Sequence, residues 1–138
     1  MPDRMVLCVD DEAILLLAAR HALRISLGDG YRYETAISAE SALDLLDGCD
    51  DDGTEVAAVI SDWLMPGMRG DEFLRKVRAR FPESCLVLLT GYADRSAVQI
   101  LKREIGLAAV LQKPCSMSSI ADIIRRSPPS SYRSEDTA

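Results

Sequence analysis

The chain has 138 residues, 48% of them hydrophobic and 28% charged, and its 16 basic and 22 acidic side chains give a net charge of −6. This is the length of one ordinary domain with a real hydrophobic core, and the composition excludes a disordered chain. No apolar run approaches the ~20 residues that span a bilayer, and the first residues lack the apolar core of a secretory signal. A net acidic chain also disfavours nucleic-acid binding. We therefore expect a cytoplasmic protein that binds neither a membrane nor a nucleic acid.

In chain order, the hydrophobic pattern predicts alternating strands and helices. The predicted elements are a strand at 5–9, a helix at 12–27, a strand at 31–37, a helix at 38–46, a strand at 56–62, a helix at 71–81, a strand at 85–89, a helix at 94–105, a strand at 108–112 and a helix at 116–126. Residues 127–138 have no periodicity and are predicted to form a loose tail after a domain at 4–126. Five strands alternating with five helices predict an α/β domain, with one parallel sheet covered by helices on both faces.

Three groups of residues in this pattern favour ordinary structural roles. The first helix carries apolar residues at helical spacing, at Ile14, Leu15, Ala18, Ala22 and Ile25. The acids between positions 44 and 55 account for the whole net charge, and residues 48–53 among them are expected to form a solvated loop. The arginines and lysine at 75, 76, 78 and 80 are expected to form a solvated helix face, with docking of a kinase as the alternative role. The four cysteines lack the spacing of a zinc site and are expected to be reduced thiols.

Functional groups stand at the ends of four of the five predicted strands. Asp10 and Asp11 follow the first strand, Asp62 ends the third, Thr90 follows the fourth and Lys113 follows the fifth. Because ligands of an open parallel sheet bind at the carboxyl ends of its strands, we expect these side chains to share one site. Three converging carboxylates need a counter-charge, and Mg²⁺ with oxygen ligands supplies one. Such an ion usually expects a phosphate as a further ligand, and the Lys113 ammonium suits a phosphoryl oxygen.

This set of side chains indicates phosphoryl transfer, with Asp62 as the nucleophile and Thr90 as a hydroxyl donor. Two other readings remain open. A Mg²⁺-dependent phosphohydrolase would place a nucleophile and an acid/base two residues apart, a spacing that Asp10 and Glu12 have. A docking domain that never receives phosphate would not need these acids at all.

The motifs resemble the receiver domain of bacterial two-component response regulators. The resemblance rests on Asp10-Asp11, on the run from Asp62 to Gly67, on Thr90-Gly91 and on Lys113-Pro114, and it covers nearly the whole chain. It implies a doubly wound (βα)5 fold with strand order 2-1-3-4-5. It further implies that a histidine kinase or phosphotransfer protein donates a phosphoryl group to Asp62, and that the protein has no other enzymatic activity.

The resemblance also implies a ligand set and a switch. Mg²⁺ would be held by Asp11, Asp62 and the backbone carbonyl of Leu64, and Asp10 would reach it through water. The peptide bond before Pro114 would be cis. Phosphorylation would draw in the Thr90 hydroxyl and reshape the face formed by the fourth helix, the fifth strand and the fifth helix.

Two features of the sequence modify these expectations. The family commonly has Tyr or Phe three residues before the lysine, where this chain has Val110, so the response of the output face is expected to differ. Leu64 and Tyr92 match positions that flank the phosphoryl group, and their bulk predicts a long-lived phosphoryl group.

No output domain is expected in this chain, so the output would be binding of a downstream protein, relay of phosphate to a histidine, or dimerisation. Arg95, Lys102 and Arg103 on the fourth helix are expected partner contacts.

Overall fold

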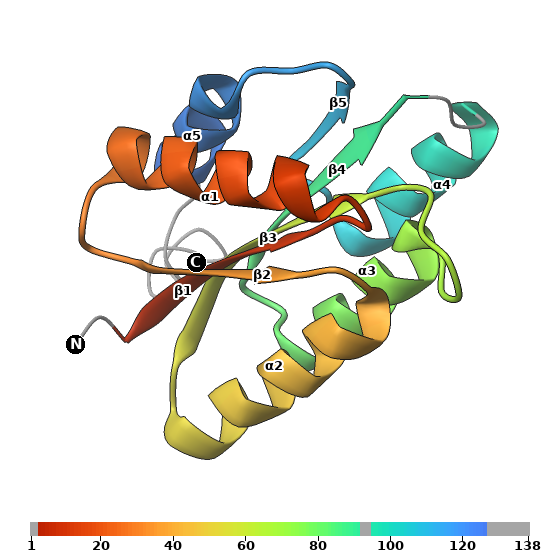
Figure 1. Ribbon diagram of the computed structural model, residues 1–138. Coiled ribbons are helices and arrows are strands. Elements are labelled where there is room, and N and C mark those ends of the chain that lie inside the picture. Colours follow the sequence, from red (N-terminus) through yellow and green to blue (C-terminus); the bar gives the residue numbers. More distant parts are fainter. Residues whose placement is uncertain (1–2, 92–94, 127–138) are drawn as a thin grey trace.

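The computed structural model describes residues 3–91 and 95–126, which form one parallel sheet between two layers of helices (Figure 1). The elements are β1 (Arg4–Val9), α1 (Ala13–Leu27), β2 (Arg32–Ala36), α2 (Ala39–Asp52), β3 (Glu55–Asp62), α3 (Gly70–Arg80), β4 (Cys85–Thr90), α4 (Arg95–Ile105), β5 (Ala109–Gln112) and α5 (Met117–Arg126). The strand order is β2-β1-β3-β4-β5, and all four pairings are parallel. The predicted fold and strand order are confirmed.

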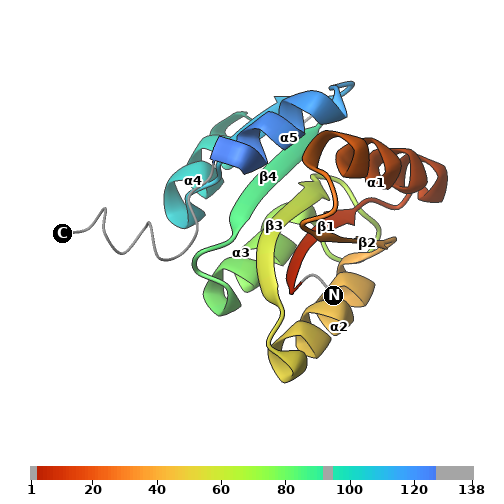
Figure 2. The same cartoon turned by 90° about the vertical axis from the view of Figure 1, so that its left-hand side faces the viewer.

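The sheet divides the hydrophobic core into two clusters because successive side chains of a strand point to opposite faces. In β1, Met5, Leu7 and Val9 face the side covered by α2, α3 and α4. Val6 and Cys8 face the side covered by α1 and α5. Figure 2 shows these two layers from the side of the molecule. Because both faces of the central strands are covered, their sequences are almost continuously apolar.

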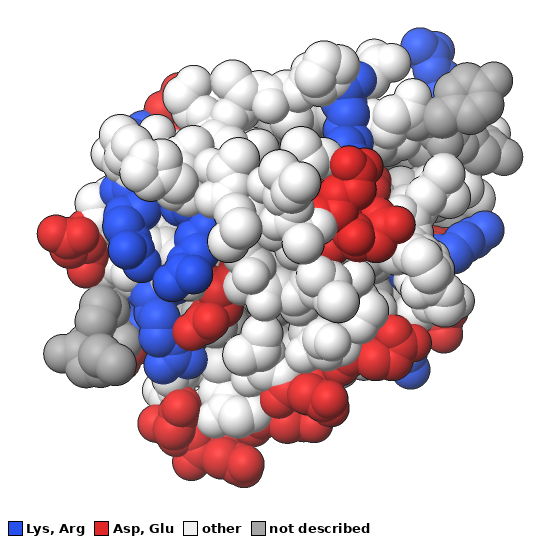
Figure 3. All heavy atoms as spheres, in the orientation of Figure 1, with Lys and Arg blue, Asp and Glu red and all other residues white. Residues whose placement is uncertain are grey.

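The acidic segment is helical, so the loop predicted at 48–53 is wrong. Ser38 caps α2 by accepting a hydrogen bond from the backbone N–H of Ser41, and the helix then continues to Asp52. It ends at Gly53, whose φ of 77° is in the left-handed region that favours glycine. Cys49 is buried under this last part of the helix, which gives the extra turn an apolar anchor. Figure 3 shows acidic side chains along α2 at the lower edge of the molecule.

The apolar stripe of α1 does not face the core. Leu16 and Leu23 are the buried residues of this helix, whereas Ile14 and Ile25 are 82% and 71% exposed. The helix is apolar on more than one side, so the spacing alone did not identify the buried side. Figure 3 shows the resulting uncharged surface over α1.

The solvated face predicted on α3 holds for Arg75 and Lys76, which are exposed, but Arg78 and Arg80 are half-buried. Arg75 nevertheless pairs with acids of α3 and α4, and the Arg78 guanidinium donates to the backbone carbonyls of Ile105 and Gly106 at the end of α4. Arg80 forms ion pairs with Asp47 and Asp50 of α2. Acids of α2 are therefore partly neutralised by α3, which the order of residues in the chain did not reveal.

Candidate functional site

The side chains predicted at the strand ends lie together at one edge of the sheet. Asp10 and Asp11 directly follow β1, and Asp62 is the last residue of β3. These three residues each offer a carboxylate oxygen, and the three oxygens lie within 4.8 Å of one another. The Lys113 ammonium, directly after β5, lies 3.4 Å from Asp10 Oδ2 and 3.3 Å from Asp62 Oδ2. The parallel sheet thus joins residues that are up to 103 positions apart.

Backbone groups hold the two inner carboxylates in the same way. Asp10 Oδ1 accepts the N–H of Glu12 at 3.0 Å, just before the start of α1. Asp62 Oδ1 accepts the N–H of Trp63 at 2.9 Å. In each case Oδ1 is fixed by the backbone and Oδ2 faces Lys113. The Oδ2 atoms of both aspartates therefore share one cation.

The site holds more negative charge than its own cation neutralises. Asp10 and Asp62 are only 7% and 8% exposed. Burial raises the pKa of Asp62 above its ordinary value, the charge of Asp10 raises it further, and Lys113 opposes both. Burial acts to lower the pKa of Lys113, but the attraction of Asp62 and Asp10 outweighs it and the pKa is raised. Lys113 is therefore a cation at neutral pH, and a further hard cation with oxygen ligands fits the remaining charge.

Thr90 ends β4 beside this cluster. The backbone N–H of Lys113 donates to the Thr90 carbonyl at 2.9 Å, which ties the ends of β4 and β5 together. Thr90, Val98 and Val110 line a cavity of about 470 Å³ on the α4 side. Val110 therefore borders open space next to Thr90, where a larger side chain would fit.

The structure places the remaining predicted residues as follows. The Lys113–Pro114 peptide bond is cis, as the resemblance implies. The Leu64 side chain is 58% exposed and lies in the loop after Asp62. Tyr92, predicted to flank the phosphoryl group, and Asp94, predicted to begin the fourth helix, lie outside the described residues, as does the predicted tail at 127–138.

Gly70 is a contributor to the site that the sequence did not reveal. Its N–H donates to the Trp63 carbonyl at 2.9 Å, which folds the loop after Asp62 back on itself. A Cβ at this position would lie 2.1 Å from the Asp62 carbonyl oxygen. Only glycine allows this approach, so Gly70 fixes the backbone of the central aspartate. The sequence signal, a glycine in a turn-rich loop, gave no hint of this contact.

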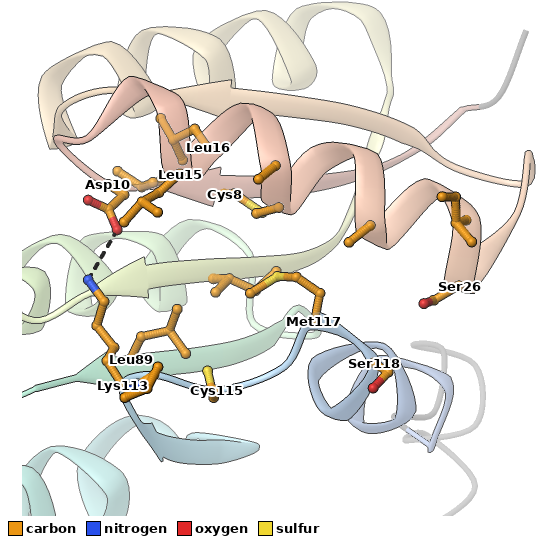
Figure 4. Close-up of a pocket in the computed structure, with 17 residues that line it drawn as sticks. Cys8, Asp10, Leu15, Leu16, Ser26, Leu89, Lys113, Cys115, Met117 and Ser118 are labelled. Atoms are coloured by element: carbon orange, nitrogen blue, oxygen red, sulfur yellow. Dashed lines mark hydrogen bonds and ion pairs between the residues drawn. The ribbon is translucent and has the colours of Figure 1, made fainter.

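A groove extends from the acidic cluster between α1 and the start of α5 (Figure 4). Its volume is about 530 Å³, and Asp10 and Lys113 lie among the residues that line it. Most of the other lining side chains are apolar, including Leu15, Ala22 and Met117. In Figure 4 the Lys113 ammonium points toward Asp10 at one end of this groove. The exposed stripe of α1 thus lies beside the site.

Comparison with known proteins identifies a family and several relatives of this chain. Residues 6–125 match the family described as the response regulator receiver domain. The chain is 33% identical to the hydrogenase transcriptional regulatory protein HoxA of Cupriavidus necator, over 88% of this chain and 23% of that protein. It is 34% identical to the response regulator protein FleR of Pseudomonas aeruginosa, over 82% of this chain and 24% of that protein. The chain thus spans about a quarter of the length of these two curated relatives.

Solved structures agree with the fold. A response regulator receiver domain protein of Clostridium thermocellum superposes with a TM-score of 0.79 at 24% identity, over 98% of this chain and 99% of that one. The chemotaxis protein CheY4 of Vibrio cholerae superposes with a TM-score of 0.73 at 26% identity, over 91% and 98% of the two chains. Within the described residues, no helix is both long enough and apolar enough to cross a membrane.

Proposed function

The chain belongs to the response regulator receiver domain family of two-component signalling, and we propose that it accepts a phosphoryl group on Asp62 from a histidine kinase or phosphotransfer protein. The observation that supports this proposal is the geometry of Asp62. Its Oδ1 is held by the Trp63 N–H, and its Oδ2 faces both Lys113 and the cluster of acids.

In the proposed step, a carboxylate oxygen of Asp62 attacks the phosphorus of a phosphohistidine. A P–O bond to Asp62 forms and the P–N bond to the imidazole breaks, and that nitrogen retains the electron pair. Lys113 neutralises charge on the transferred phosphoryl oxygens, and the Thr90 hydroxyl donates to one of them. The catalysis is mainly positioning and neutralisation of charge, as expected for phosphoryl transfer. This self-modification is the only chemistry that we assign to the chain, because the family functions in signalling.

Mg²⁺ is the proposed cofactor, because the available ligands are hard oxygens with excess negative charge. Asp11, Asp62 and the Leu64 carbonyl would hold the ion, and Asp10 would contact it through water. When bound, it neutralises phosphoryl oxygens during transfer. Backbone N–H groups hold the carboxylates of Asp10 and Asp62, so the chain itself orients these two ligands.

The surface beside the site suits a helix of the phosphoryl donor. The exposed Ile14, Ala18, His21 and Ile25 of α1 follow one another at intervals of four, three and four residues, the spacing at which two helices interlock. No acid lies within α1, whereas Arg20 and Arg24 are exposed. We expect the donor to present an apolar helix flanked by acids here, which would place its histidine near Asp62.

The response is assigned to the face formed by α4, β5 and α5. Thr90 borders the cavity that Val110 leaves open, and both residues would form the switch between Asp62 and this face. Arg95, Lys102 and Arg103 of α4 would contact a downstream protein or a second copy of the chain. We place this function within residues 4–126 and in the cytoplasm.

Intact-mass measurement after incubation with acetyl phosphate and Mg²⁺ tests the proposal. We expect the mass of one phosphoryl group to be added, no gain in the Asp62→Asn variant, and a gain in the Asp51→Asn variant. Asp51 is an exposed acid of α2 and serves as the matched control. Chelation of Mg²⁺ should abolish the gain. A mass gain that persists in Asp62→Asn contradicts the proposal, and steady turnover of a phosphate ester supports the phosphohydrolase alternative.

A further inference from the structure

A continuous series of contacts connects the residue after Asp62 with α4. Trp63 is buried in the core, and the guanidinium of Arg69 lies over its ring, 5.5 Å from the ring centre. Arg69 also donates twice to Asp71, from Nε to Oδ1 at 3.1 Å and from Nη2 to Oδ2 at 2.8 Å. Such a two-point pair between arginine and carboxylate has a defined geometry.

Asp71 shares its charge between two arginines. It lies in the first turn of α3 and is 6% exposed. Besides the contacts with Arg69, its Oδ2 accepts a hydrogen bond from Arg75 Nη1 at 3.4 Å. The hydrogen bond from Arg69 holds the pKa of Asp71 below its ordinary value. The Arg69 bond is the shorter one, so Asp71 is bound mainly to Arg69 in this state.

Arg75 carries the series across to α4. Its Nη2 donates to Glu104 Oε1 at 2.9 Å, whereas its bond to Asp71 is the longer 3.4 Å. A second tether lies beside it, because Arg78 donates to the carbonyls of Ile105 at 2.6 Å and Gly106 at 3.1 Å. The last turn of α4 is thus bound to α3 through Glu104 on one side and through backbone carbonyls on the other.

We propose that the series Trp63–Arg69–Asp71–Arg75–Glu104, here called the α3 ladder, couples the state of Asp62 to the attachment of α4. The inference rests on the proposed function of Asp62. A phosphoryl group adds about −1.5 to −2 charges next to Trp63 and attracts the Arg69 guanidinium. Asp71 then loses its main partner and draws Arg75 away from Glu104. α4 keeps the Arg78 tether, about which it can turn.

The α3 ladder supplies a route to the output surface that does not involve Thr90 and Val110. The near end of the ladder is close to the acceptor, because Gly70, which follows Arg69, lies against the Asp62 carbonyl. The far end is Glu104 on α4, one residue before Ile105, whose carbonyl Arg78 binds. Because coupling between two sites is reciprocal, a change at Glu104 must also alter the phosphorylation equilibrium at Asp62.

Amide hydrogen exchange of residues 95–105 in the full chain tests the ladder without phosphorylation. The described hydrogen bonds and ring contact of Arg69 are with Asp71 and Trp63, not with α4. The Arg69→Gln variant should nevertheless exchange about two- to fivefold faster in α4, the range expected for loss of a partly exposed ion pair. Arg75→Gln should give a similar increase. Lys76→Gln removes the same charge from an exposed neighbour on the same helix and should behave as the wild type. Unchanged exchange in Arg69→Gln overturns the ladder.

The same measurement with acetyl phosphate and Mg²⁺ tests the link to Asp62, and intact mass reports the extent of phosphorylation separately. Phosphorylated wild type should exchange about two- to fivefold faster in α4, and the increase should be lost in Arg75→Gln at an equal phosphoryl level. A wild-type increase in phosphorylated Arg75→Gln overturns the coupling. If neither the wild type nor the variants gain mass, the proposed function of Asp62 is contradicted instead. The exchange rate of α4 in unphosphorylated Arg69→Gln still tests whether the ladder exists.

Discussion

Replacing Gly70 with alanine should destabilise the protein, although it adds a good helix former to the start of α3. The added Cβ would lie 2.1 Å from the Asp62 carbonyl oxygen and 3.0 Å from the Trp63 Cα, both of them backbone atoms. Relief of such an overlap costs about 1–3 kcal/mol, and loss of the Gly70 N–H bond to Trp63 about 1 kcal/mol more. The higher helix propensity of alanine relative to glycine offsets about 0.5–1 kcal/mol of this destabilisation. We expect a net loss of about 1–3 kcal/mol in the free energy of unfolding.

Urea unfolding measures this loss against a matched glycine. With a slope of about 2 kcal/mol per M, a loss of about 2 kcal/mol lowers the midpoint by about 1 M. Gly48 lies inside α2, and a Cβ there would meet no atom within 4 Å. Gly48→Ala should therefore raise stability by about 0.5–1 kcal/mol. A Gly70→Ala midpoint equal to or above that of the wild type would refute the reasoning, because the approach of this loop to Asp62 would then not be tight.

Other changes give further tests. Asp62→Asn should raise the free energy of unfolding at pH 7, because the raised pKa of Asp62 makes its ionisation unfavourable in the folded state. Chemical denaturation should show that this gain vanishes below pH 3.8, where the carboxyl is protonated in both the folded and the unfolded state. Asp71→Asn should lower the free energy of unfolding by about 0.5–1 kcal/mol at pH 7, because the pKa of Asp71 is lowered in the folded state. This loss should disappear as the pH falls below 3.8, and a loss that does not depend on pH would contradict the reasoning. Arg80→Gln should lower the free energy of unfolding by about 0.5 kcal/mol, because the ion pairs with Asp47 and Asp50 of α2 are lost. This loss should vanish in about 1 M salt if it is electrostatic. Leu64→Asn should shorten the lifetime of the phosphoryl group, measured by intact mass over time, and an equal lifetime would show that the Leu64 side chain does not hinder water.

The sheet was predictable because its central strands are buried on both faces and read as continuous apolar runs. The position of the site followed from the same pattern, since parallel strands bring Asp10, Asp62 and Lys113 to one edge of the sheet. The family resemblance added the strand order and the cis bond before Pro114, which the structure confirms. Neither could be derived from composition or periodicity.

The errors came from interactions between elements. The turn that extends α2 past Leu46 depends on burial of Cys49 and on ion pairs with Arg80, and neither is visible within the helix itself. The buried side of α1 could not be chosen because its apolar residues occupy several sides. The contact of Gly70 with Asp62 and the ladder through Arg69 depend on how a loop folds back, which no local pattern encodes.

The position of the phosphoryl group on the chain tests the central claim most directly. After treatment with acetyl phosphate and Mg²⁺, borohydride reduces an acyl phosphate to an alcohol, and peptide mass mapping then locates the altered carboxyl. We predict that the alteration lies on Asp62 alone and that it is absent when acetyl phosphate is omitted. An alteration on Asp10, the nucleophile of the phosphohydrolase alternative, or no alteration of any aspartate in protein treated with acetyl phosphate would contradict the proposal.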